Sequence, residues 1–345
     1  GSYFLPWDSI RYPGLGEHAP GTHINDALTR EANGQIDRAV ADGVPFFVSV
    51  AHYAVHTPIV GQGDPAYLDR YGDRPDPEDD YSALLESMDA SLGAILDNLE
   101  RHGIAENTLV VFFSDNGGLS NHTRNATDIY TAPGGLTVWF ERDRHNSPLK
   151  GGKGSAYEGG VRVPMIVSWA RPSPDNSAGA GRLPITPGSV SDRPVISDDL
   201  LPTLIGAAGL AEAGDSIRGM DGVDLSPLLT GDETAHGDRA IYIHYPHQWY
   251  RDIGVGVGIQ PFTAMRKGAW KLIYFYGDGY ADGQGLDPWF ELYDLRQDVG
   301  ETDDMVQARP EVLRSMALEM YEWMVDVEAQ TPVSKATTQP VPLPQ

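Results

Sequence analysis

Three short segments of this chain carry residue types that could bind a metal ion or an anion. In the first, Asp115 and Asn116 stand side by side before two glycines, so two oxygen ligands share one tight turn. Ca²⁺ and Mg²⁺ take about six or more oxygen ligands, so the pair predicts only part of a metal site. An ordinary Asp-Asn-Gly turn is the alternative interpretation.

The second segment, Leu149–Pro164, contains five glycines and three cationic side chains. Glycines let the backbone approach a tetrahedral anion, and a lysine such as Lys153 adds a point charge. The segment does not have the spacing of a nucleotide-binding P-loop. It therefore predicts an anion-binding loop of another kind, and a flexible loop with solvated lysines is the alternative.

The third segment contains His52 and His56, four residues apart. On a helix this spacing would suit zinc, but Pro58 and the apolar run before His52 predict a loop. A histidine that follows a strand can donate to an anion or protonate a leaving group. Each histidine could equally be a structural hydrogen-bonding residue.

The elements that must position these segments are predicted from apolar patterns. A helix is predicted over Asp80–Arg101, where apolar residues recur at three- and four-residue steps. Three apolar runs have the length of buried strands, namely Pro45–Ala51, Thr108–Phe113 and Pro164–Trp169. This order is typical of a doubly wound parallel sheet, which binds ligands beyond the carboxyl ends of its strands. The His52–His56 segment and the Asp115–Asn116 pair both lie at the carboxyl ends of such strands.

The pattern changes at about Ala240. Short strand-like runs separated by Gly and Asp turns are followed by a predicted helix at Pro310–Val325, which indicates a small antiparallel α+β subdomain. We therefore predict a partial α/β domain at 1–238, an antiparallel sheet with a helix at 239–328, and an extended tail at 329–345.

Composition excludes several classes of function. The net charge of −24 argues against a nucleic-acid partner, because phosphate binding needs clustered Lys and Arg. No apolar run approaches the roughly 18 residues that span a bilayer, and no signal peptide is visible at the N-terminus. The absence of cysteine excludes disulfides, thiolate zinc sites and cysteine nucleophiles.

Taken in order, the segments VAHYAVHTP, VVFFSDNGG and PLKGGKGSAYEGGVRVP resemble the type I, formylglycine-dependent sulfatases of the alkaline-phosphatase superfamily. Further similar blocks are AMRKGAWKLI and ELYDLRQDVGET. The resemblance covers residues from about 1 to 325. It implies an alkaline-phosphatase-like α/β/α sandwich, here without its N-terminal part, followed by a small antiparallel subdomain. It also implies a periplasmic or secreted protein.

The resemblance also implies roles for single residues. Asp115 and Asn116 match two ligands of one Ca²⁺ site, which could also take Mg²⁺. Lys153 matches the lysine that binds the ester sulfate, and His56 matches the histidine near the leaving oxygen. Glu158 and Arg162 belong to the same signature and are interpreted as supports of the loop. His122, Arg124 and His247 lie where members of this family often build substrate subsites, here for a sulfated carbohydrate or another sulfate ester. Ordinary surface polar residues are the alternative interpretation.

One part of the family pattern is missing from these residues. Sulfatases form their formylglycine nucleophile in a C/S-x-P-x-R signature, and this chain contains no such match. Three interpretations follow: a truncated reading frame, one piece of a split enzyme, or a pseudoenzyme that only binds sulfated glycans. Catalysis by these residues alone is therefore not expected.

Because Asn116 replaces the histidine of two-metal phosphatases, sulfatase chemistry is favoured, and a one-metal phosphodiesterase or phosphonate hydrolase is the alternative.

Overall fold

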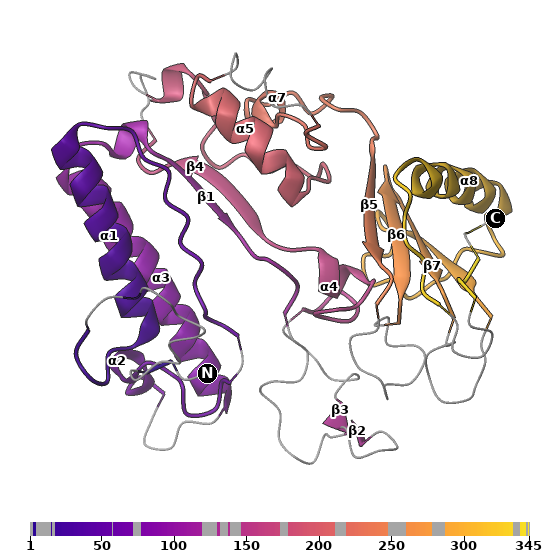
Figure 1. The fold of residues 1–345 in the computed structure, drawn as a ribbon, viewed down its shortest axis with the longest axis horizontal. Coiled ribbons are helices and arrows are strands. Elements are labelled where there is room, and N and C mark those ends of the chain that lie inside the picture. The colour runs from indigo at the N-terminus through magenta and orange to yellow at the C-terminus, as the bar shows by residue number, and fades with distance from the viewer. Residues whose placement is uncertain are drawn as a thin grey trace. The chain divides into compact units, whose positions relative to one another are not determined.

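The computed structural model describes most of the chain, namely residues 3–4, 15, 18–56, 58–71, 77–118, 130–131, 137–138, 146–172, 179–210, 219–247, 260–277, 287–333, 339–342 and 344. The fold is mixed α/β (Figure 1). The chain divides into two compact units. The first comprises residues 1–110, 122–126 and 167–184, and the second comprises the remainder.

Two long helices, α1 (Ile24–Asp42) and α3 (Pro77–Arg101), form the body of the first unit. Helix α1 begins at His23, whose Nδ1 accepts a hydrogen bond from Asn25 N at 3.3 Å, and ends at Gly43 in the left-handed conformation. Helix α3 confirms the prediction made from its apolar spacing. Shorter helices in this unit are α2 (Pro65–Leu68), η1 (Ala105–Asn107) and η3 (Gly179–Gly181).

Two of the predicted strands are present, and they form a two-stranded sheet: β1 (Leu109–Phe113) and β4 (Met165–Trp169). Ala170 N donates to Thr108 O at 2.8 Å, and Ser114 N donates to Pro164 O at 3.4 Å. The beginning of β1 therefore faces the end of β4, so the pair is antiparallel, and the expectation of a parallel arrangement was wrong for these strands.

The predicted strand at Pro45–Ala51 was also wrong. The described residues from Val44 to Tyr53 form neither a helix nor a strand, and the Phe47 side chain is 78% exposed. A strand requires a hydrogen-bonded neighbour, and an apolar run of seven residues does not specify one.

The C-terminal part of the second unit is a four-stranded antiparallel sheet in the order β5-β6-β7-β8. Its strands are β5 (Ala240–Tyr245), β6 (Phe262–Lys267), β7 (Trp270–Phe275) and β8 (Trp289–Asp294). The helix α8 (Pro310–Asp326) follows. This arrangement confirms the predicted antiparallel sheet with its helix.

Both faces of this sheet are covered. Met265, Leu272 and Leu292 pack against methionines of α8, together with Val341 from the C-terminal residues. Their neighbours Ala264, Ile273 and Tyr293 point to the other face and pack against Ala156 and Tyr157. Because successive side chains of a strand alternate between faces, β6 and β7 are buried along most of their length. The glycine-rich segment is therefore part of the core of this unit.

The remaining elements of the second unit are short: β2 (Tyr130–Thr131), β3 (Thr137–Val138), α4 (Glu158–Val161), η4 (Ser197–Asp199), α5 (Leu200–Ala207) and α7 (Ser226–Leu229). Asp199 is fully buried, accepts hydrogen bonds from Ile196 N and Val223 N at 2.9 Å each, and forms an ion pair with Arg239. Across the described residues, no helix combines the length and the apolar character needed to cross a membrane.

Candidate functional site

The Asp-Asn-Gly-Gly turn begins where β1 ends. Ser114 Oγ donates to Asn116 O at 2.8 Å, and Asn116 Nδ2 donates to Gly117 O at 2.8 Å. The amide nitrogen of Asn116 is thus used within the turn, while its Oδ1 is available as a ligand. Asp115 is exposed. The turn therefore presents two oxygen groups of the kind that Ca²⁺ and Mg²⁺ prefer.

This turn is joined directly to the glycine-rich loop. Gly117 N donates to Gly160 O at 2.9 Å, and Lys153 N donates to Gly118 O at 3.0 Å. Asn146 bonds both sides, because its Nδ2 donates to Gly118 O at 2.8 Å and to Gly151 O at 3.2 Å. The structure thus brings the backbone of Lys153 to a residue three positions after Asp115.

The glycines of the loop are needed because backbone segments approach one another closely. A Cβ on Gly117 would lie 1.8 Å from Gly159 O, and one on Gly160 would lie 2.4 Å from Ser155 O. No side chain can be accommodated at such distances without moving the backbone. The glycines predicted to admit an anion therefore also allow the loop to fold against the Asp-Asn turn.

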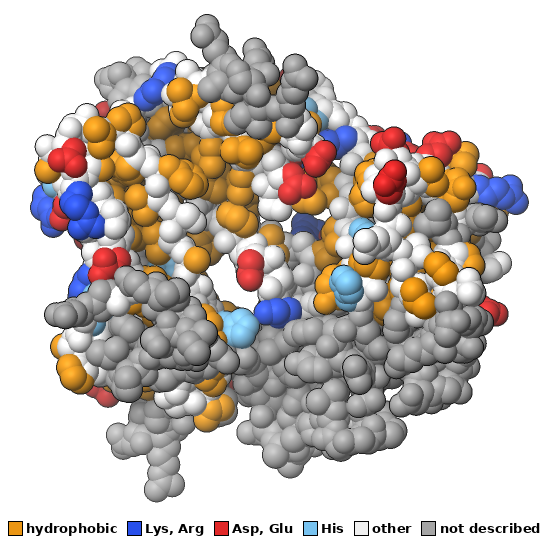
Figure 2. All heavy atoms as spheres, in the orientation of Figure 1, with side chains coloured by type: hydrophobic (Ala, Val, Ile, Leu, Met, Phe, Trp, Pro, Cys, Tyr) orange, Lys and Arg blue, Asp and Glu red, His pale blue; other side chains and the backbone are white. Residues whose placement is uncertain are grey.

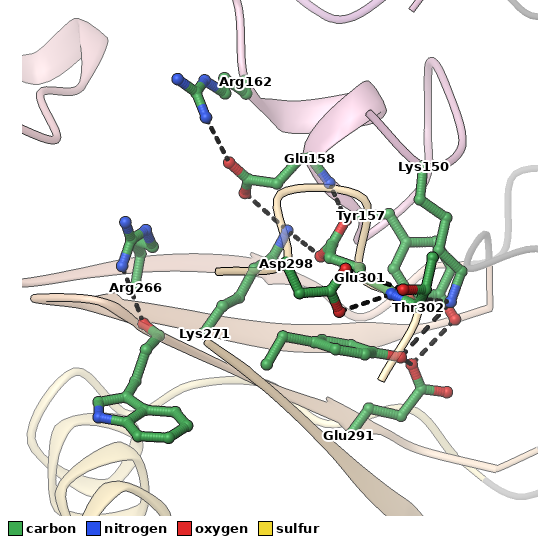
Figure 3. Close-up of polar contacts among 12 residues, drawn as sticks. Lys150, Tyr157, Glu158, Arg162, Arg266, Lys271, Glu291, Asp298, Glu301 and Thr302 are labelled. Atoms are coloured by element: carbon green, nitrogen blue, oxygen red, sulfur yellow. Dashed lines mark hydrogen bonds and ion pairs between the residues drawn. The ribbon is translucent and has the colours of Figure 1, made fainter. Parts of the chain in front are cut away.

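A buried charge cluster lies beneath the loop (Figure 3). Lys271 of β7 is 2% exposed, and its Nζ lies 2.9 Å from Glu158 Oε1 and 2.8 Å from Glu301 Oε1. Glu301 also accepts a hydrogen bond from Glu158 N at 2.7 Å. Burial raises the pKa of Glu301, and the neighbouring Lys271 ammonium opposes that shift. Glu158, predicted as a loop support, thus contacts the C-terminal sheet.

The other lysine at the start of the loop is occupied by structural contacts. Lys150 Nζ lies 3.7 Å from the centroid of the Tyr157 ring and 3.2 Å from Glu301 O. Tyr157 and Tyr293 both donate to Glu291 Oε2, at 2.9 and 2.7 Å. Burial is the main cause that raises the pKa of both phenols, so they remain protonated donors. Lys150 therefore supports the loop through its contacts with Tyr157 and Glu301.

His56 belongs to the first unit, where it is exposed at the end of a short turn. His56 N donates to Tyr53 O at 2.8 Å, and the buried Tyr3 hydroxyl lies 2.6 Å from His56 O. Asp115, Asn116 and Lys153 belong to the second unit, so a shared site with His56 remains a prediction. His52 is different, because burial lowers its pKa and its Nε2 lies 3.4 Å from Ser91 Oγ.

Of the three residues predicted to build substrate subsites, the structure describes one. His122 and Arg124 lie outside the described residues. His247 is exposed, and its ring centroid lies 5.8 Å from that of Tyr245 at the end of β5. Within the part of the chain that the structure describes, no group of three or more His, Asp or Glu side chains could hold a metal ion. Asp115 and Asn116 thus fit part of a coordination shell.

Sequence reasoning did not find the Lys271–Glu158–Glu301 cluster as a unit. Lys271 lies in a strand-like run and Glu301 lies in a loop, 30 residues apart. Nothing in either local pattern predicts that the two side chains meet. The only available signal was that both residues lie within blocks that resemble the family.

Comparison with known proteins agrees with this arrangement. The family model described as Sulfatase matches residues 4–210, and that described as N-sulphoglucosamine sulphohydrolase, C-terminal, matches residues 152–330. A sulfatase of Formosa agariphila is 30% identical, covering 96% of this chain and 56% of the relative. Human arylsulfatase A is 31% identical, covering 79% of this chain and 47% of the relative. The chain thus spans about half the length of these curated relatives.

Solved structures show the same similarity. The crystal structure of Ps i-CgsB is 27% identical with a TM-score of 0.64, and the match covers 91% of this chain and 57% of that chain. Its complex with k-i-k-neocarrahexaose is 26% identical over 95% of this chain and 59% of that chain, also with a TM-score of 0.64. The predicted α/β class is confirmed.

Proposed function

Because this chain belongs to the sulfatase family, we propose that it forms the sulfate-binding part of a sulfuric ester hydrolase. The observation that carries the proposal is the hydrogen bond from Lys153 N to Gly118 O at 3.0 Å. It joins the loop with the sulfate-binding lysine of the family pattern to the turn with the metal-ligand pair. Lys153 would neutralise the charge of the sulfate oxygens, and His56 would protonate the leaving oxygen.

The metal of this site would be held in part by Asp115 and Asn116. Their carboxylate and amide oxygens favour Ca²⁺, with Mg²⁺ as the alternative. A divalent ion would polarise the sulfate ester, and the formylglycine of the family supplies the nucleophile. The remaining metal ligands would come from residues outside the Asp-Asn turn.

We propose that a further segment, either an N-terminal part or a complementary chain, completes the site. Hydrophobic side chains are visible at the surface over the strand pair β1–β4 (Figure 2). Phe113 is 43% exposed and Ile166 is 61% exposed. Exposed apolar patches of this kind mark surfaces that contact another segment or protein. The chain without that segment would bind sulfate but would not turn over a sulfate ester.

The substrate is proposed to be a sulfated carbohydrate. Support comes from the relative solved with k-i-k-neocarrahexaose, at 26% identity. Exposed His247 would contribute to the sugar subsite, as would His122 and Arg124. A non-catalytic glycan-binding role and a one-metal phosphodiesterase or phosphonate hydrolase activity are the alternatives that the test below separates.

The test combines this chain with the N-terminal half of a related sulfatase and measures turnover of matched sulfate, phosphate-diester and phosphonate esters. The proposal predicts turnover of the sulfate ester, loss of that turnover in Lys153→Ala, and none with either part alone. The control variant Lys267→Ala alters an ion pair with Glu319 on the opposite side of the sheet core and should retain activity. Preferential turnover of a phosphorus ester, or glycan binding without any turnover, would contradict the proposal.

A further inference from the structure

The buried cluster beneath the glycine-rich loop contains more negative than positive charge. Lys271 lies between Glu158 and Glu301, and all three side chains are less than a tenth exposed. A further cation, Arg162, has its Nη1 3.9 Å from Glu158 Oε2, but its side chain is 54% exposed. Burying several charges costs desolvation energy, and apolar residues of similar volume would often be at least as stable. Stability alone is therefore a weak explanation for this cluster.

The backbone at Glu301 adds a second cost. Its φ angle is +51°, in the left-handed region that a residue with a side chain seldom adopts. The conformation directs Glu301 so that its two carboxylate oxygens separately contact Lys271 Nζ and Glu158 N. Unfavourable backbone conformations of this kind persist where the surrounding structure holds them, and they gather at functional sites.

The contacts of Glu158 lead directly to the proposed site. Glu158 begins α4, and the next two residues, Gly159 and Gly160, lie against the Asp-Asn turn. Gly160 O accepts from Gly117 N at 2.9 Å, and a Cβ on Gly117 would overlap Gly159 O. There is no space at this junction to absorb a displacement. A shift of Glu158 would therefore move Gly117 and, through Gly118, the backbone of Lys153.

We propose that Lys271, Glu158 and Glu301 are positioning residues, through which the C-terminal sheet sets the location of Lys153 and of the Asp115–Asn116 turn. The cluster fixes the first turn of α4 against β7, and α4 in turn supports both segments. The affinity of the site for a sulfate group thus depends on a lysine that does not contact the ligand. This inference rests on the proposed function.

The experiment titrates the full 345-residue chain, in the presence of Ca²⁺, with inorganic sulfate and follows the Lys153 amide signal. Lys271→Met should weaken sulfate binding about tenfold, as expected when a coupled neighbour is removed. The matched control is Lys267→Met on β6, whose ion pair with Glu319 is partly exposed. It should bind sulfate as the unaltered chain does. Equal affinities of the two variants would overturn the inference.

A second variant separates positioning from stability. In Lys271→Met, the carboxylates of Glu158 and Glu301 both lose their lysine. The double variant Lys271→Met with Glu301→Gln also removes one of these two carboxylates, so its resistance to urea should partly recover. Sulfate affinity should stay low, because no cation links β7 to Glu158. Affinity that recovers together with resistance to urea would mean that the cluster only stabilises the fold.

The failure of the proposed function would look different. The unaltered chain would then bind sulfate no better than Lys153→Ala. Positioning is still measured in that case by amide hydrogen exchange, which in Lys271→Met should become faster at residues 115–118 and 150–162 but not along β6. Unchanged exchange in those two segments would overturn the positioning role by itself.

Discussion

Gly117→Ala should separate the Asp-Asn turn from the glycine-rich loop. The added Cβ would lie 1.8 Å from Gly159 O, 2.7 Å from Gly159 C and 2.9 Å from Gly160 Cα. All three atoms belong to the backbone, so no side chain can rotate to make space. Because contacts under 3.0 Å are essentially never seen for real Cβ atoms, Gly159 O must retreat by about 1.2 Å.

The expected decrease in the free energy of unfolding has two causes. Overpacking a close backbone contact costs about 1–3 kcal/mol, and the hydrogen bond from Gly117 N to Gly160 O, worth about 1 kcal/mol, would be broken or lengthened. We therefore expect the free energy of unfolding to fall by about 2–4 kcal/mol. Sulfate binding at Lys153 should weaken as well, since Lys153 N bonds the next residue of the turn, Gly118.

The assay is urea unfolding of the full chain followed by circular dichroism, compared with the same substitution at Gly93. A Cβ on Gly93, within α3, meets nothing within 4 Å. Gly93→Ala should stabilise the protein by up to about 1 kcal/mol, through helix propensity. If the free energies of unfolding of Gly117→Ala and of the unaltered chain differ by less than about 0.5 kcal/mol, the close contact between Gly117 and Gly159 does not exist.

Three further predictions test other parts of the account. Arg239→Met should lower the free energy of unfolding by about 3–5 kcal/mol in urea, because it leaves the fully buried Asp199 carboxylate without its cation; Arg193→Met, in an exposed pair with Asp238, should cost less than about 1 kcal/mol. Burial raises the pKa of Tyr274 to about 12, so its protonated form is favoured in the folded state. The contribution of this phenol to the free energy of unfolding should be fully present below about pH 10 and should be lost as the pH rises toward 12. Urea midpoints measured against pH should therefore fall less in Tyr274→Phe than in the unaltered chain. Asp115→Ala should weaken Ca²⁺ binding about tenfold or more by calorimetry, whereas Asp303→Ala, in the exposed loop after Glu301, should leave it unchanged.

Much of the secondary structure could be predicted from the sequence, because local periodicity reflects which side of an element is buried. The repeated three- and four-residue steps of α3 and the apolar runs of β1 and β4 were sufficient for their assignment. Pro45–Ala51 has an equally apolar composition, yet it has no strand partner among the described residues. Strand pairing and direction depend on contacts between distant segments, which a single run does not encode.

The candidate site was likewise predictable from the sequence only in part. The side-by-side oxygen ligands and the glycine-rich loop with Lys153 could be recognised from residue types and order, and the structure joins these segments through Gly118. The support beneath them could not be recognised, because Lys271 and Glu301 reach Glu158 only through the fold of the C-terminal sheet. The roles of Asp115, Asn116, Lys153 and His56 in binding remain predictions.

The most direct test of the central claim is a crystal structure of the full chain grown with Ca²⁺ and selenate, with selenium located by its anomalous signal. We predict selenate at Lys153 Nζ and Ca²⁺ on the oxygens of Asp115 and Asn116, on either side of the hydrogen bond between Lys153 N and Gly118 O. Selenate bound away from Lys153, or Ca²⁺ bound away from the Asp-Asn turn, would contradict it.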